Sequence, residues 1–143
     1  MRISAKADYA VRVLLELASS PDGSLRKEQI AERQQIPARF LESIMTELRE
    51  LGFVRAHRGD NAGYWLSHPP ELISLAMILE SIDGPLVMVH GSSSDETSYA
   101  GIAAPLRDAW VSAGNAFRGV LDHVSIAELV QRSTEPLERA SAG

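Results

Sequence analysis

Apolar residues recur at spacings of three and four over the first fifty positions, which is the period of an amphipathic helix. The pattern predicts a first helix whose apolar side is formed by Ala7, Ala10, Val11, Leu14 and Ala18. The turn residues 21–23 end this helix. A short second helix from about Lys27 to Arg33 then directs Ile30 and Ala31 inward.

A third helix is predicted from Ala38 to the glycine at position 52 that stops it. Its apolar stripe consists of Leu41, Ile44, Met45, Leu48 and Leu51. Its opposite face carries Ala38, Arg39, Glu42, Ser43 and Thr46. A helix of roughly four turns is long enough to enter a DNA major groove, so this face is free to contact bases. For Phe40, near the start of the helix, a base contact and a core position remain equally open.

Two short strands follow, over Phe53–His57 and Tyr64–Leu66, joined by a glycine turn over 59–63. Helix, turn, helix and hairpin in this order are typical of a winged helix. We therefore expect a mostly α fold with a small two-stranded wing, and this fold favours DNA binding.

In the second half of the chain, predicted helices flank a segment without apolar periodicity. Ser74 can cap a fourth helix, which Gly84-Pro85 terminates. The segment from His90 to Tyr99 has no apolar period and is expected to be a mobile acidic loop. Ser125 and Glu128 form a capping box for a last short helix that reaches Val130.

A long helix after the loop carries a seam of apolar residues at alternating spacings of four and three, as in a coiled coil. The seam consists of Leu106, Trp110, Ala113, Phe117, Val120 and Val124. We expect it to form a dimer interface; the alternative is an ordinary helix packed on its own domain. The predicted organisation is a winged helix-turn-helix over 1–85, the loop over 86–104, and the dimerisation helix, final helix and tail over 105–143.

Composition narrows the possible functions. The 143 residues suffice for one domain or a domain with an extension, and the absence of cysteine excludes disulfides and thiolate metal sites. Neither a run of 18 apolar residues nor a signal peptide is found, so we expect a cytoplasmic protein without a membrane partner. No zinc spacing of histidines and no catalytic motif is present, so we expect neither metal, cofactor nor enzymatic activity.

The net charge of −5 is unevenly distributed along the chain. Residues 1–70 hold ten Lys or Arg and nine Asp or Glu, whereas residues 71–143 hold four and ten. The first half can therefore present a local basic face to phosphates. The candidate phosphate and wing contacts are Arg2, Lys6, Arg26, Lys27, His57, Arg58 and Asn61.

Several segments resemble the Rrf2-type bacterial transcription regulators. They are Met1–Ser4, Asp8–Arg12, Ile30–Gln34, Arg58-Gly59, Gly63-Tyr64, Ile82–Pro85 and Pro105–Trp110. The resemblance covers nearly the whole chain and implies a dimeric winged-helix regulator. Many members of the family sense iron, nitric oxide or redox state through an iron–sulfur cluster on three cysteines.

The places that match those cysteines lie near Gly91 or Ser92, near Ser98, and at Ala104. Serine and alanine supply no thiolate, so we expect the usual sensor chemistry to be missing. Natural divergence and deliberate replacement of the cysteines would look alike. The wing also departs from the family, with Asn61 and Ala62 where glycines are common.

The resemblance also bears on two carboxylates. Some relatives use an acidic residue at the place of Asp8 as a cluster ligand, but here a helix-surface or hinge role is favoured. Relatives use a glutamate at the place of Glu42 for base recognition, and a carboxylate there can accept a hydrogen bond from cytosine N4. The alternative for Glu42 is a solvated surface charge.

We expect a homodimeric, sequence-specific transcription regulator, a repressor, that binds a near-palindromic operator. A small-molecule effector is a further possible partner. The candidate effector residues are Asp8, His90, Ser92, Ser98, Tyr99 and Ala104. The alternatives are a cysteine-replaced form of an iron–sulfur or redox-sensing regulator, and a winged-helix module that binds another protein.

Overall fold

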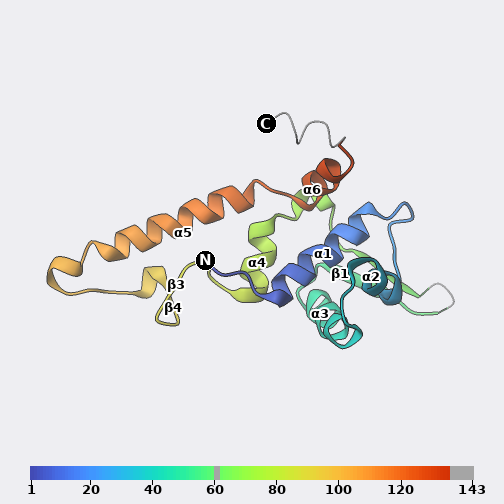
Figure 1. The fold of residues 1–143 in the computed structure, drawn as a ribbon, viewed down its shortest axis with the longest axis horizontal. Helices are drawn as coiled ribbons and strands as arrows, with labels where there is room; N and C mark the ends of the chain where they lie inside the picture. The colour runs from blue at the N-terminus through green and yellow to red at the C-terminus, as the bar shows by residue number, and fades with distance from the viewer. Residues whose placement is uncertain (60–61, 136–143) are drawn as a thin grey trace.

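The computed structural model describes residues 1–59 and 62–135, and Figure 1 shows a helical body from which one long helix extends. The α-helices are α1 (Ala5–Ser19), α2 (Lys27–Gln34), α3 (Ala38–Glu50), α4 (Leu75–Asp83), α5 (Leu106–Asp122) and α6 (Ile126–Ser133). The strands are β1 (Val54–His57), β2 (Gly63–Leu66), β3 (Met88–Val89) and β4 (Ser92–Ser93). Three 3-10 turns are η1 (Pro70–Leu72), η2 (Ser94–Glu96) and η3 (Gly101–Ala103).

Helix α1 is the centre of the body and contacts α2, α3, α4 and α6. The largest fully buried side chains are Leu14, Leu17, Ile30, Leu41, Met45, Leu48, Ile73, Ile78 and Ile126. Each buried side chain of this size contributes about 1.5–3 kcal/mol relative to an exposed one. The predicted stripe of α3 is buried except for Leu51, which is exposed because α3 ends one residue before it.

Helix α3 ends in a Schellman motif that starts the wing. The Gly52 N–H donates to the Arg49 carbonyl at 3.1 Å, and the Phe53 N–H donates to the Leu48 carbonyl at 2.9 Å. Gly52 has a φ of 82°, a conformation that glycine adopts without steric cost. Phe53 is buried, so the turn holds β1 against the end of α3.

The wing is an antiparallel pair in which Val54 faces Leu66 and His57 faces Gly63. It is anchored to the body by a bridge between Leu25 and Tyr64, with N–H to carbonyl distances of 3.0 and 2.7 Å. The wing therefore has a fixed position beside the start of α2.

The segment after α4 differs from the prediction. We expected no regular structure over residues 90–99, but β4 lies within this segment and forms a hairpin with β3, with Met88 opposite Ser93. His90 and Gly91 both have positive φ, at 51° and 80°, as a two-residue type I′ turn requires. The periodicity of the sequence missed this hairpin because each strand is only two residues long.

Helix α5 extends from the body, as the orange ribbon in Figure 1 shows. None of its residues, all of which belong to the described part of the chain, is buried. Four seam residues are exposed large hydrophobics, namely Leu106, Trp110, Phe117 and Val120. The helix ends at Asp122, so Val124 lies beyond it, where its carbonyl accepts a hydrogen bond from the Leu75 N–H at 2.9 Å.

The fold class is confirmed: a mostly α chain with a small two-stranded wing and a long helix near its C-terminal end. Within residues 1–59 and 62–135, no helix has the length and apolar character that crossing a membrane requires.

Candidate nucleic-acid interface

The polar face of α3 lies on the surface, as its periodicity predicted. Its exposed residues include Ala38, Arg39, Phe40, Glu42, Ser43 and Thr46. The Thr46 hydroxyl donates to the Glu42 carbonyl at 3.0 Å, and its oxygen can still accept a hydrogen bond. Phe40 is 46% exposed and the Arg39 guanidinium lies 4.8 Å above its ring, so Phe40 belongs to the surface and not to the core.

An ion pair joins the two helices of the helix-turn-helix on this face. The Lys27 Nζ of α2 lies 2.5 Å from a carboxylate oxygen of Glu42 on α3. This hydrogen bond raises the pKa of Lys27 above its ordinary value. In the free protein Glu42 is therefore paired with Lys27 through one carboxylate oxygen, and its second oxygen is available for another donor.

A hollow of about 280 Å³ lies between the start of α2, the end of α3 and the wing. Its cationic or basic lining residues are Arg26, Lys27, Arg49, His57 and Arg58, and they outnumber its one carboxylate, Glu28. The His57 ring lies 5.4 Å from the Trp65 ring, which supports it across the wing. Fixed cations gathered in one concave surface suit the phosphates of a nucleic-acid backbone.

Arg49 and Tyr64 also line this hollow, and neither was predicted from the sequence as a DNA contact. Arg49 lies three residues after Thr46 on α3, so helical spacing alone could have placed it beside the predicted face. The backbone bridge between Tyr64 and Leu25 places Tyr64 in this hollow, and no local sequence pattern predicts that bridge.

Lys6 and Arg2, which were also predicted to contact DNA, do not line this hollow. Lys6 forms an ion pair of 3.1 Å with Glu47, which ties α1 to α3. Arg2 lies instead in a hollow beside the end of α4, away from the hollow at the wing. Asn61 lies outside the residues that the structure describes.

The predicted effector residues do not gather into one site in the described chain. Asp8 pairs with Arg12 at 3.2 Å within α1. Tyr99 is engaged with α5, where its hydroxyl accepts a hydrogen bond from the Trp110 Nε1 at 3.1 Å. His90, Ser92, Ser98 and Ala104 are exposed along the segment that returns toward α5.

A winged helix-turn-helix with an exposed polar recognition helix beside a basic hollow defines the class of DNA-binding regulators. The Rrf2 family model, described as an iron-dependent transcriptional regulator, matches residues 3–132. The chain belongs to the Rrf2 family, which is a family of transcriptional regulators and not of enzymes.

Similar proteins support this assignment. An HTH-type transcriptional regulator of Mycobacterium tuberculosis is 40% identical over 130 residues, which cover 90% of this chain and 81% of that protein. The structure of CymR, the global cysteine regulator of Bacillus subtilis, is 27% identical with a TM-score of 0.77, covering 92% of this chain and 98% of that one. The structure of IscR from T. potens is 25% identical with a TM-score of 0.74, covering 93% and 88%.

The family description raises the question of iron, and the residues of this chain do not fit a cysteine-ligated cluster. The sequence contains no cysteine, and the places matched to ligands hold serine hydroxyls and an alanine methyl group. Among the residues described, no three His, Asp or Glu side chains are grouped so that they could hold a metal ion. Hard hydroxyl oxygens do not replace the thiolates that such clusters require.

Proposed function

We propose that this chain is a homodimeric, sequence-specific repressor that binds a near-palindromic operator without a cysteine-ligated iron–sulfur cluster. The observation that carries the proposal is the surface of α3. Its apolar stripe is buried against α1 while Arg39, Glu42 and Ser43 face outward beside the basic hollow at the wing. That arrangement offers base contacts and phosphate contacts on one side of the molecule.

The assignment of contacts follows from chemistry. Glu42 accepts a hydrogen bond from cytosine N4, and Arg39, at the start of α3, reaches base edges in the major groove. Arg26, Arg49 and Arg58 hold phosphates at the flanks, and Lys27 stays paired with Glu42. Because DNA is the partner, we place the protein in the cytoplasm.

The dimer is supported by the surface of α5. Val120 is 67% exposed and Phe117 is 41% exposed, and a stripe of large apolar side chains is costly to leave in water. A second copy that places its own seam against this one buries both stripes by twofold symmetry. Two α3 helices then face two half-sites about one duplex turn apart.

Selection of bound duplexes from a random pool tests this function. We expect enrichment of a near-palindrome with two matching half-sites, and we expect the protein to lower transcription in vitro from a promoter that overlaps the selected site. Enrichment of one asymmetric half-site would contradict the dimer. Binding that does not distinguish sequences would contradict specific recognition, and increased transcription would contradict repression.

A further inference from the structure

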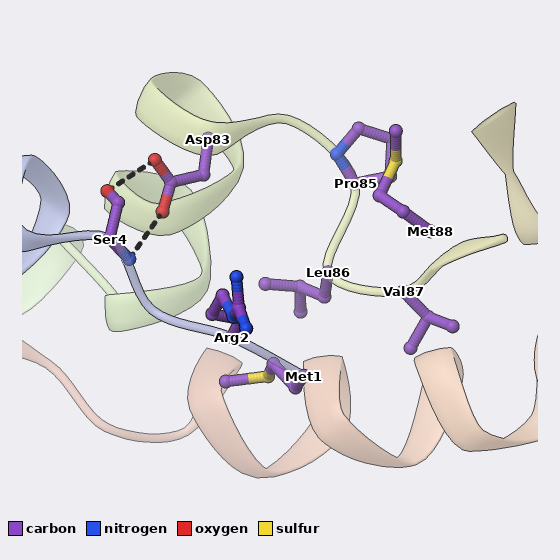
Figure 2. A pocket seen from close by; sticks show the side chains of 8 residues that line it. All are labelled: Met1, Arg2, Ser4, Asp83, Pro85, Leu86, Val87 and Met88. Atoms are coloured by element: carbon purple, nitrogen blue, oxygen red, sulfur yellow. Dashed lines mark hydrogen bonds between the residues drawn. The ribbon is translucent and has the colours of Figure 1, made fainter. Parts of the chain in front are cut away.

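A hollow of about 550 Å³ lies where the start of the chain, the end of α4 and the segment leading to β3 meet. Figure 2 shows the labelled side chains around it, with the Ser4–Asp83 hydrogen bonds on one side and the ribbon of α5 below. Its apolar lining consists of Met1, Pro85, Leu86, Val87 and Met88. Its polar lining consists of Arg2, Ser4 and Asp83. Its volume is within the range of about 300–1,000 Å³ that small-molecule sites occupy.

The two charged groups in the hollow differ in their partners. The two Asp83 carboxylate oxygens accept hydrogen bonds from Ser4, one from its hydroxyl at 2.6 Å and one from its backbone N–H at 3.2 Å. Arg2 forms no ion pair with any residue in the described part of the chain. The polar group left for a ligand is therefore the Arg2 guanidinium.

We propose that this hollow binds a small organic monocarboxylate with a hydrocarbon body. The carboxylate pairs with the Arg2 guanidinium, whose planar donors match its two oxygens. The hydrocarbon body covers Leu86, Val87 and Met88 and removes apolar surface from water. A second negative charge on the ligand is disfavoured, because the Asp83 carboxylate lies in the same hollow.

The location of the hollow gives a bound ligand a means of control. Ser4 caps α1, accepting a hydrogen bond from the Ala7 N–H at 3.0 Å, and Asp83 is the last residue of α4. On the other side, Val87 packs against α5 at Gly114, where an added Cβ would lie 3.6 Å from the Val87 side chain. A ligand between these elements contacts both the DNA-binding body and the segment that rests on α5.

We infer that occupancy changes the angle between the body and α5, and thus the separation of the two α3 helices in the dimer. This consequence rests on the proposed function, whereas binding of the ligand does not. The two are therefore measured separately, first on the protein alone and then with DNA.

Hexanoate is a suitable probe, with hexylamine as a ligand of the same hydrocarbon body and opposite charge. In ¹H–¹⁵N NMR titrations of the full chain, we expect hexanoate to shift the backbone amides of Leu86, Val87 and Met88, and we expect hexylamine to leave them unchanged. Arg2→Gln should weaken hexanoate binding by about tenfold, the effect of losing one charge-assisted pair. Arg132→Gln, which removes an exposed arginine on α6, is the matched control and should leave binding unchanged.

Equal amide shifts with hexanoate and hexylamine would contradict the proposed binding site. So would an equal loss of hexanoate affinity in Arg2→Gln and Arg132→Gln. In a second measurement, saturating hexanoate should change the operator affinity of the wild-type protein severalfold and leave that of Arg2→Gln unaltered. Amide shifts at the hollow without any change in operator affinity would show that hexanoate binds there, and would contradict an effect of this binding on DNA affinity. A protein that binds hexanoate but no selected operator would contradict the proposed function and leave the site in place.

Discussion

Replacement of Glu42 by alanine separates base recognition from phosphate binding, because the carboxylate has two partners. In the free protein it pairs with Lys27 at 2.5 Å, and on DNA it accepts a hydrogen bond from cytosine. Glu42→Ala therefore removes a base contact and at the same time frees a cation that lines the wing hollow.

The structure sets the size of each effect. The Lys27 and Glu42 side chains are 29% and 67% exposed, so their pair contributes no more than about 1 kcal/mol to folding, and the variant stays folded. Loss of the base contact lowers discrimination at a C·G pair by about 1–3 kcal/mol, or about five- to 150-fold. One additional phosphate contact by the freed Lys27 steepens the salt slope by about 0.9, which is about 3.5-fold in affinity between 50 and 200 mM salt.

The assay is fluorescence anisotropy with the selected operator, the same duplex with one C·G pair replaced, and a random duplex, each at several salt concentrations. Glu32→Ala is the matched control, because it removes the same charge from an exposed position on α2. We expect Glu42→Ala to bind random DNA more tightly at low salt and to lose its preference for C·G. Equal losses on the operator and on random DNA, with an unchanged salt slope, would refute the role of both Glu42 and its pair with Lys27.

Three further predictions concern the scaffold. Val120→Glu should give a monomer in sedimentation velocity, because it places a charge in the seam, whereas Asn115→Glu on the opposite face of α5 should remain a dimer; a dimeric Val120→Glu would contradict the seam. Gly52→Ala should lower the free energy of unfolding in urea by about 1–2 kcal/mol, since its φ of 82° strains an L side chain, and an unchanged midpoint would contradict the Schellman turn. The hydrogen bond from Ser93 lowers the pKa of Asp95, so its stabilisation is present above the ordinary pKa and is lost as the pH falls through the lowered value. Ser93→Ala should raise that pKa in a ¹³C NMR titration, and an unaltered titration would argue against the bond.

The elements that the sequence predicted well are those fixed by local periodicity. The apolar spacing of Leu41, Ile44, Met45 and Leu48 determines which face of α3 is buried, and the polar face follows from it. Gly52 marks the helix end because few other residues adopt its backbone conformation. Both signals lie within a few positions of the structure they specify, so a single sequence suffices to predict them.

What the sequence could not supply depends on contacts between distant residues. Lys27 and Glu42 were selected separately as DNA contacts, but their pairing requires the packing angle of α2 on α3. The hollow at Arg2 requires Ser4 to meet Asp83, which lies 79 positions away. The β3–β4 hairpin was missed for a different reason, because strands of two residues leave no periodic signal.

Native mass spectrometry of the complex measures whether two copies of this chain bind one near-palindromic duplex, as we propose. With the selected operator, we expect one species that contains two 15.6 kDa chains and one duplex, free of iron and sulfide. A species with a single chain per duplex would contradict the dimer, and a complex that carries the mass of an iron–sulfur cluster would contradict the cluster-free regulator proposed here.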